Sequence, residues 1–152
     1  MKILGKNAVD YIDAIKIPLL IRIALALVMA CWVTLTVFIG GTNTTEIVSI
    51  LLWILTIGVG IILAAYSGFN MARKKGTLAN CALTGLLFGL VSGAVAWTLD
   101  MFPNILGMIQ TSDVSGYMFW MMLNMVLSIA ASLGDAILAL IGGVIGGALK
   151  NK

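Results

Sequence analysis

The strongest constraint on this 152-residue chain is a series of four long apolar runs, separated by polar connections. A bilayer core of about 30 Å needs about 20 apolar residues in a helix that rises 1.5 Å per residue. Each run is long enough to meet that requirement. The predicted spans are residues 17–40, 47–69, 78–99 and 121–149. The sequence therefore predicts an all-α integral membrane protein in which four transmembrane helices form a compact antiparallel bundle.

Composition supports this class of protein. Hydrophobic residues make up 61% of the chain and charged residues 10%, whereas soluble domains average about 45–50% apolar and about 25% charged. A soluble domain of this size must keep much of its chain in water, so it has no place for so much apolar surface. We expect residues 17–149 to form one membrane domain and residues 150–152 a short cytoplasmic tail.

The fourth apolar run is longer than one crossing needs, since it extends from Tyr117 to Leu149. We expect it either to tilt or to place its first, aromatic turns in the outer interface. Before it, residues 100–117 form the only long predicted loop, in which Pro103 and Gly107 break the helical pattern. This loop would be a lid, a docking surface or a simple connection.

Orientation follows from the basic residues, which mark the cytoplasmic side of a membrane protein. All nine fall on one side of a four-span chain: Lys2, Lys6, Lys16, Arg22, Arg73, Lys74, Lys75, Lys150 and Lys152. The other side carries only the acidic residues Glu46, Asp100 and Asp113. We therefore expect an integral protein of the cell membrane with both termini in the cytoplasm. The basic residues that should determine this topology are Lys16, Arg22, Arg73, Lys74, Lys75 and Lys150.

The first sixteen residues show a separate pattern. Apolar residues at Leu4, Ala8, Ile12 and Ile15 recur at helical spacing, and charged residues occupy the other positions. This pattern predicts a short interfacial amphipathic helix over residues 1–16, lying on the inner membrane surface before Pro18. The alternative is a frayed polar terminus.

Small residues at intervals of four predict close packing of the spans. Helices approach one another in lipid through small side chains, because the hydrophobic effect contributes little between them. The candidate packing residues are Gly60, Gly68, Gly85, Gly89, Gly93, Gly142, Gly143, Gly146 and Gly147. The partner of each face is either another helix of the same chain or a second chain. We expect a homo-oligomer or a subunit of a larger membrane complex.

Asp135 is the strongest candidate for chemistry, because it lies well inside the fourth span. A carboxylate at that depth costs several kcal/mol and faces protein or water rather than lipid. It ends a polar stripe with i, i+4, i+8 and i+11 spacing, formed by Asn124, Ser128, Ser132 and Asp135. Such a stripe either lines a narrow proton or ion path or binds span four to its neighbours.

The partner of Asp135 is open at this stage. Arg22 is the one basic residue within a predicted span, and it is expected near the inner end, within reach only if Asp135 lies deep. Neutral partners for a packing hydrogen bond are Ser132, Ser128, Thr84, Ser92 and Asn80.

Enzyme signatures are not found in the sequence, which has no His and no phosphate-binding glycine loop. The basic residues lie at the ends of apolar runs, a distribution that does not suggest nucleic-acid binding. We expect no cofactor or metal. The first functional hypothesis is a non-enzymatic structural or accessory subunit that assembles through its glycine faces. The alternative is a small proton- or cation-coupled transporter or channel that uses Asp135 and the polar stripe.

Overall fold

The computed structural model describes residues 2–39, 43–111 and 114–150. A two-stranded antiparallel hairpin, β1 (Lys2–Ile3) and β2 (Lys6–Asn7), precedes the helices. The helices are α1 (Ala8–Ile39), α2 (Asn43–Arg73), α3 (Leu78–Thr111) and α4 (Val114–Lys150). Each is long and apolar enough to cross a membrane. The structure thus confirms the prediction of four apolar helices packed in an all-helical bundle.

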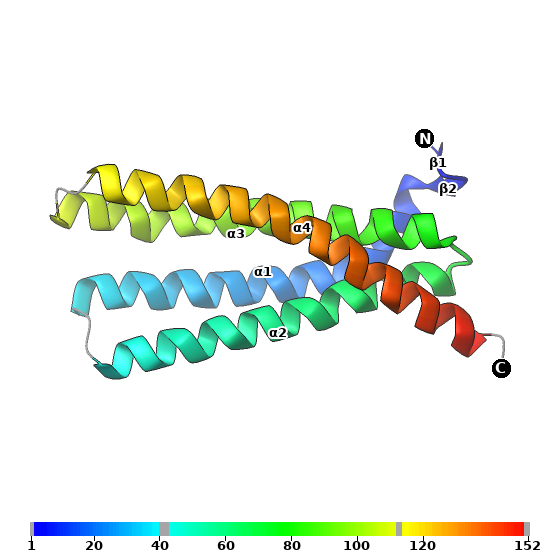
Figure 1. The fold of residues 1–152 in the computed structure, drawn as a ribbon, viewed down its shortest axis with the longest axis horizontal. Helices are drawn as coiled ribbons and strands as arrows, with labels where there is room; N and C mark the ends of the chain where they lie inside the picture. The colour runs from blue at the N-terminus through cyan, green and yellow to red at the C-terminus, as the bar shows by residue number, and fades with distance from the viewer. Residues whose placement is uncertain (1, 40–42, 112–113, 151–152) are drawn as a thin grey trace.

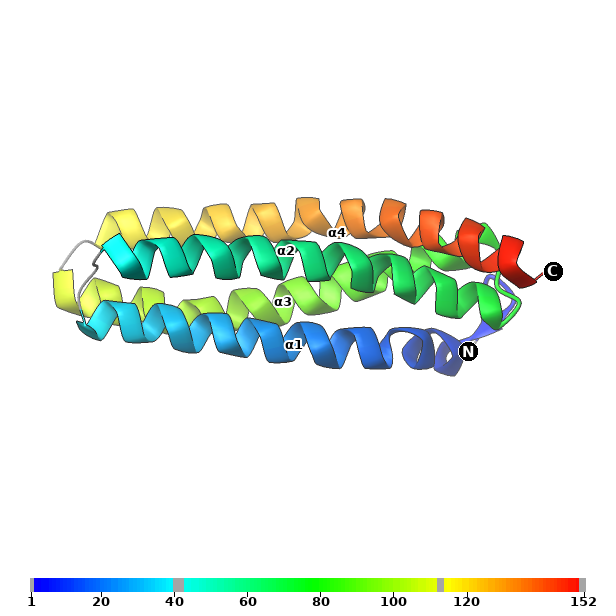
Figure 2. The ribbon, with the colours of Figure 1, turned by 90° about the horizontal axis from the view of Figure 1, so that it is seen from below.

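The helices occupy the corners of a square in cross-section. The most extensive contacts join α3 to α4, α2 to α4, α1 to α3 and α1 to α2. Figures 1 and 2 show the same order, with α1 and α4 at diagonal corners. The chain ends and the α2–α3 connection lie at one end of the bundle, and the other two connections lie at the opposite end (Figure 1). We call the first of these the basic end.

The helices come closest together around Ala139 of α4, which is fully buried. A Cβ atom built on Gly68 of α2 would overlap the Ala139 backbone, and one built on Gly85 of α3 would overlap the Ala139 side chain. One turn further along α4, a Cβ on Gly142 would overlap the carbonyl group of Ala65. Only glycine allows backbones to approach this closely.

The remaining predicted packing glycines follow the same principle. A Cβ on Gly143 would lie 2.6 Å from the Cys81 sulfur, and one on Gly146 would lie 2.9 Å from the Phe69 ring. Gly93 instead lines a groove between α3 and α4. The surroundings of Gly147 fall outside the described residues. Most of the predicted packing glycines are therefore occupied by contacts within one chain, whereas Gly93 faces the groove.

The helices are longer than the predicted spans, and the largest difference is at residues 100–117. This segment was expected to be a loop, which is wrong for all but its middle, because α3 continues through Pro103 to Thr111 and α4 begins at Val114. Pro103 and Gly107 are both buried, one turn apart on the same face. The apolar residues around them continue the helical period, so packing outweighs the local cost of the proline.

The predicted interfacial helix over residues 1–16 is also wrong. Residues 2–7 form the hairpin, whose turn at Leu4 and Gly5 uses positive φ angles of 49° and 79°. α1 then begins at Ala8 and runs without interruption through Pro18. This part of α1 buries a face against the bundle instead of lying free on a surface, since Tyr11, Ala14 and Ile15 are all buried.

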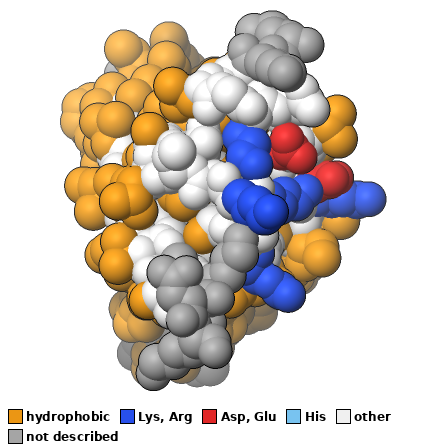
Figure 3. All heavy atoms as spheres, turned by 90° about the vertical axis from the view of Figure 1, so that its right-hand side faces the viewer, with side chains coloured by type: hydrophobic (Ala, Val, Ile, Leu, Met, Phe, Trp, Pro, Cys, Tyr) orange, Lys and Arg blue, Asp and Glu red, His pale blue; other side chains and the backbone are white. Residues whose placement is uncertain are grey.

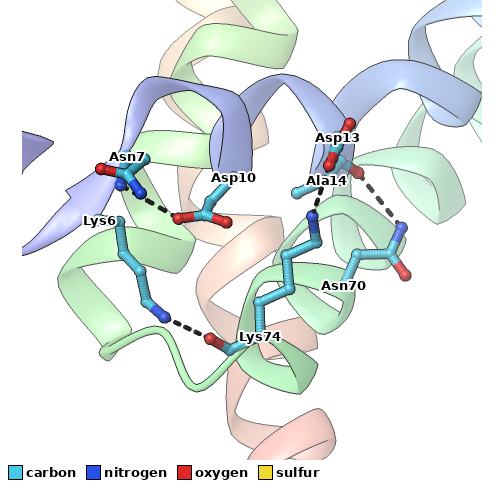
Figure 4. A network of polar contacts seen from close by, with 7 residues as sticks. All are labelled: Lys6, Asn7, Asp10, Asp13, Ala14, Asn70 and Lys74. Atoms are coloured by element: carbon cyan, nitrogen blue, oxygen red, sulfur yellow. Dashed lines mark hydrogen bonds and ion pairs between the residues drawn. The ribbon is translucent and has the colours of Figure 1, made fainter. Parts of the chain in front are cut away.

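Polar contacts fasten the start of α1 to the end of α2 (Figure 4). The backbone N–H of Asn7 donates to Asp10 Oδ2 at 3.1 Å, which caps the start of α1. Asn70 Nδ2 donates to the carbonyl of Ala14 at 3.2 Å, and Lys74 forms an ion pair with Asp13 at 3.1 Å. The Lys6 amine donates to the Lys74 carbonyl. These contacts explain why the N-terminal segment docks on the bundle.

The close approach at Gly142 generates a stability prediction. Gly142→Ala should lower the free energy of unfolding by about 1–3 kcal/mol, because the new methyl group overlaps the Ala65 backbone. Gly134→Ala on the same helix is the matched control, since its Cβ would meet no atom within 4 Å. That change should be neutral or stabilising by up to about 1 kcal/mol. Thermal unfolding in detergent measures both, and equal effects would contradict the packing described.

Candidate functional site

Arg22 projects from α1 toward α2. Its guanidinium donates a hydrogen bond to the backbone carbonyl of Thr56 on α2. A Cβ atom on Gly60 would lie 2.6 Å from Arg22 Nη1, so the glycine makes room for the guanidinium. Gly60 thus makes room for a side chain rather than for the backbone of a neighbouring helix. Its spacing from the other small residues did not predict this role.

Asp135 projects from α4 toward α3. A Cβ atom on Gly89 would lie 2.8 Å from Asp135 Oδ2 and 2.6 Å from the Cα of Ser132. Ser132 and Asp135 therefore face the same helix, as the predicted polar stripe requires. The side chains of Asn124 and Ser128, the other two members of the stripe, lie outside the described residues.

Arg22 and Asp135, both among the described residues, lie near enough across the diagonal of the bundle to influence each other's charge, but they form no ion pair or hydrogen bond with each other. Arg22 was expected near the inner end of the predicted span, and α1 begins nine residues before that span, so Arg22 lies well inside the helix. Arg22 lies about 20 Å along α1 from Ala8, and Asp135 lies about 20 Å before the end of α4. The two opposite charges consequently sit at the same level, near the middle of the bundle. We call Arg22, Gly60, Gly89 and Asp135 the charged layer.

Four of the five neutral side chains proposed as partners of Asp135 make other hydrogen bonds, and the side chain of Ser128 lies outside the described residues. Ser132 Oγ donates to the carbonyl of Ile129 at 2.6 Å, Thr84 donates to Asn80 at 2.7 Å, and Ser92 donates to Gly89 at 3.3 Å. Within the described ranges, no hydrogen bond reaches the Asp135 carboxylate. This arrangement favours an electrostatic role for Asp135 over a packing hydrogen bond.

The charged layer separates two halves of different packing. Among the described residues, every buried hydrophobic side chain except Ala30 and Pro103 lies between the charged layer and the basic end. One cluster contains Ile15, Leu63, Ala64 and Phe88. The packing is therefore dense on the basic side and loose on the opposite side.

The loosely packed half contains three apolar or mixed hollows. One, of about 500 Å³, lies between α1 and α3 and includes Ala30, Thr34 and Leu99. A second, of about 440 Å³, lies between α1 and α2 beside Glu46. The third, of about 280 Å³, is the α3–α4 groove beside Gly93 and Trp97.

The basic side is closed by two successive barriers. The first is the apolar cluster around Phe88, which is 1% exposed. The second is a buried hydrogen bond in which the Tyr11 hydroxyl donates to Asn80 Oδ1 at 2.6 Å. The same hydroxyl lies 3.0 Å from the carbonyl of Ile3 in the hairpin. The N-terminal segment thus takes part in closing this end.

The fold is a small bundle of four helices that are long and apolar enough to span a membrane, with a charged layer near its middle. Comparisons with protein-family models, with curated proteins and with solved structures found no match to the chain. Function must therefore be inferred from the charged layer and its surroundings alone.

The electrostatic pairing predicts that Arg22 and Asp135 are energetically coupled. Arg22→Gln or Asp135→Asn alone leaves one unbalanced charge inside the bundle, so each should destabilise the fold. The effect of Asp135→Asn should be smaller in the Arg22→Gln background, with a coupling of about 0.5–3 kcal/mol. Unfolding measured in detergent for the four proteins tests this. Strictly additive effects would show that the charges act independently.

A second prediction concerns the space that Gly60 provides. Gly60→Ala should displace the Arg22 guanidinium and destabilise the bundle by about 1–3 kcal/mol. Gly58→Ala, two residues earlier on α2, is the control, because its Cβ would meet nothing within 4 Å. If the two variants unfold at the same temperature, Gly60 has no role in seating Arg22.

Proposed function

We propose that this chain is a small integral protein of the cell membrane whose Arg22–Asp135 pair forms the centre of a proton- or cation-coupled transport path. The observation that carries this proposal is the placement of two opposite charges from diagonal helices at one level, without an ion pair between them, where dense packing ends. Charged residues inside membrane helices characteristically mark proton and ion paths. The proposed protein is non-enzymatic.

The proposed arrangement in the membrane is an antiparallel bundle with both termini in the cytoplasm. Its support is the gathering of basic side chains on one end of the molecule (Figure 3) and the rule that such residues stay in the cytoplasm. A bilayer with its headgroups is about 40–45 Å thick. With the basic end at the inner surface, a layer about 20 Å away would lie near the membrane centre.

In this proposal the structure corresponds to a state closed toward the cytoplasm. Phe88 and the Tyr11–Asn80 hydrogen bond separate Asp135 from the basic end. The looser half, with its three hollows, faces outward. Asp135 would accept a proton or cation from that side, and Arg22 would balance its charge when the site is empty. Release to the cytoplasm would require the Tyr11–Asn80 hydrogen bond to open.

The transport proposal is tested by proton and cation flux in liposomes. Asp135→Asn should reduce flux to the level of empty liposomes, because the amide cannot exchange a proton or balance a cation. Gly134→Ala, at the neighbouring position, should retain flux, since its new methyl group meets no atom. Flux that survives Asp135→Asn would exclude this residue as the carrier.

The proposed topology is tested by cysteine labelling in intact cells. In a Cys31→Ser background, cysteine at Glu46 should react with a membrane-impermeant maleimide, and cysteine at Lys75 should react only after permeabilisation. Both positions are exposed, and the remaining native thiol of Cys81 is buried. The reverse pattern of labelling would invert the topology and contradict cytoplasmic termini.

The second candidate function is a structural or accessory subunit. The observation that favours it is the α3–α4 groove, where Gly93 and Ala94 present small side chains beside Trp97. Small residues are what a partner helix needs for close approach in lipid. Mass measurement in mild detergent tests this: an oligomer or complex that Gly93→Leu disrupts would support it. A monodisperse monomer would count against a homo-oligomer.

A further inference from the structure

The cations at the basic end whose side chains the structure describes fall into two groups. Lys74 forms an ion pair with Asp13, and the Lys6 amine donates to the Lys74 carbonyl, so both are engaged within the protein. Lys16, Arg73 and Lys75 are exposed, and within the described part of the chain no carboxylate forms an ion pair with them. We call these three residues the cationic rim.

Arg73 is held in place by aromatic side chains on its own helix. Tyr66 and Phe69 stack with their ring centroids 6.3 Å apart, and the Arg73 guanidinium carbon lies 5.9 Å from the Phe69 centroid. A cation over an aromatic face is attracted by the ring quadrupole, which limits the conformations of the side chain. Arg73 thus presents a partly ordered set of donors of the geometry that binds phosphate in a bidentate manner.

The cationic rim lies where the apolar surface meets the polar end. Ile17, which directly follows Lys16, has an exposed side chain. Leu78, the first residue of α3 and three residues after Lys75, is also exposed. Lys16 and Arg73 each lie within about one helical turn of the Asn70–Ala14 hydrogen bond that joins α1 to α2. The rim therefore occupies the border that lipid phosphates would contact in an inserted protein.

We propose that the cationic rim binds the headgroup of an anionic phospholipid in the cytoplasmic leaflet. Its three uncompensated positive charges complement a lipid with net negative charge. A zwitterionic lipid carries the same phosphate together with a cationic group, so it is the weaker ligand. Basic residues near an anionic membrane surface typically strengthen binding by about fivefold each. The proposal rests on the membrane insertion proposed above, but it is independent of transport through Asp135.

The test is native mass spectrometry of the full chain purified with equimolar phosphatidylglycerol and phosphatidylcholine. The wild-type protein should retain phosphatidylglycerol preferentially, and Arg73→Gln should weaken that retention by about fivefold. Lys74→Gln is the matched control, because it removes one positive charge from the same end but from an amine already paired with Asp13. It should weaken retention less. Arg73→Lys, which keeps the charge, should fall between wild type and Arg73→Gln.

Three results would overturn the proposal. Equal retention of the two lipids would exclude a preference for negative charge. Equal losses in Arg73→Gln and Lys74→Gln would show that overall charge, not the rim, attracts the lipid. Displacement of phosphatidylglycerol by an equal concentration of inorganic phosphate would identify a site for a soluble anion instead.

The lipid proposal and the transport proposal can fail separately. Flux measured in liposomes of phosphatidylcholine alone reports on Asp135 without anionic lipid. Preferential binding of phosphatidylglycerol by a protein that conducts neither protons nor cations would support the cationic rim and contradict only transport. If Arg73→Gln does not fold, as judged by circular dichroism in detergent, the comparison of Arg73→Lys with Lys74→Gln provides the same test.

Discussion

The rest of the structure depends on the close approach of three helices around Ala139. For a bundle inserted in lipid, apolar side chains gain little by leaving one apolar environment for another, so van der Waals contact between closely packed helices would supply much of the stability. Gly68, Gly85 and Gly142 permit that contact, because any Cβ at these positions would overlap a neighbouring helix. The dense half of the bundle is built around this crossing.

The crossing also determines where the charged layer lies. Asp135 stands about one turn from Ala139 on α4 and faces the same neighbour, α3. Bringing α4 close to α2 and α3 therefore carries the Asp135 carboxylate into the bundle, opposite the guanidinium of Arg22. Gly60 and Gly89 provide the space that the two charged side chains occupy. Small residues thus have two uses here, helix contact and accommodation of charge, which a spacing pattern alone does not distinguish.

The two ends of the bundle differ for a physical reason. On the basic side, α1 is extended by its capped start at Asn7 and Asp10 and is fastened to α2 and α3 by polar contacts (Figure 4). On the other side, Ala30 and Pro103 are the buried hydrophobic side chains among the described residues. This asymmetry would provide an access path to the charged layer from the loosely packed side, closed toward the basic end. The cationic rim at the closed end would then hold the protein in its leaflet.

The sequence by itself determined the number and type of the helices, because apolar runs of this length form few structures other than long apolar helices. It also identified Asp135 and most of the packing glycines, since both are conspicuous in an apolar helix. Only the tertiary structure decided that Arg22 and Asp135 share a level, because that depends on α1 beginning at Ala8 and on the diagonal placement of α1 and α4. Likewise, Pro103 predicts a break when read locally, whereas packing on both sides keeps α3 helical. Local pattern thus determined what kind of element each segment forms, and contacts between distant segments determined where the elements end and which side chains meet.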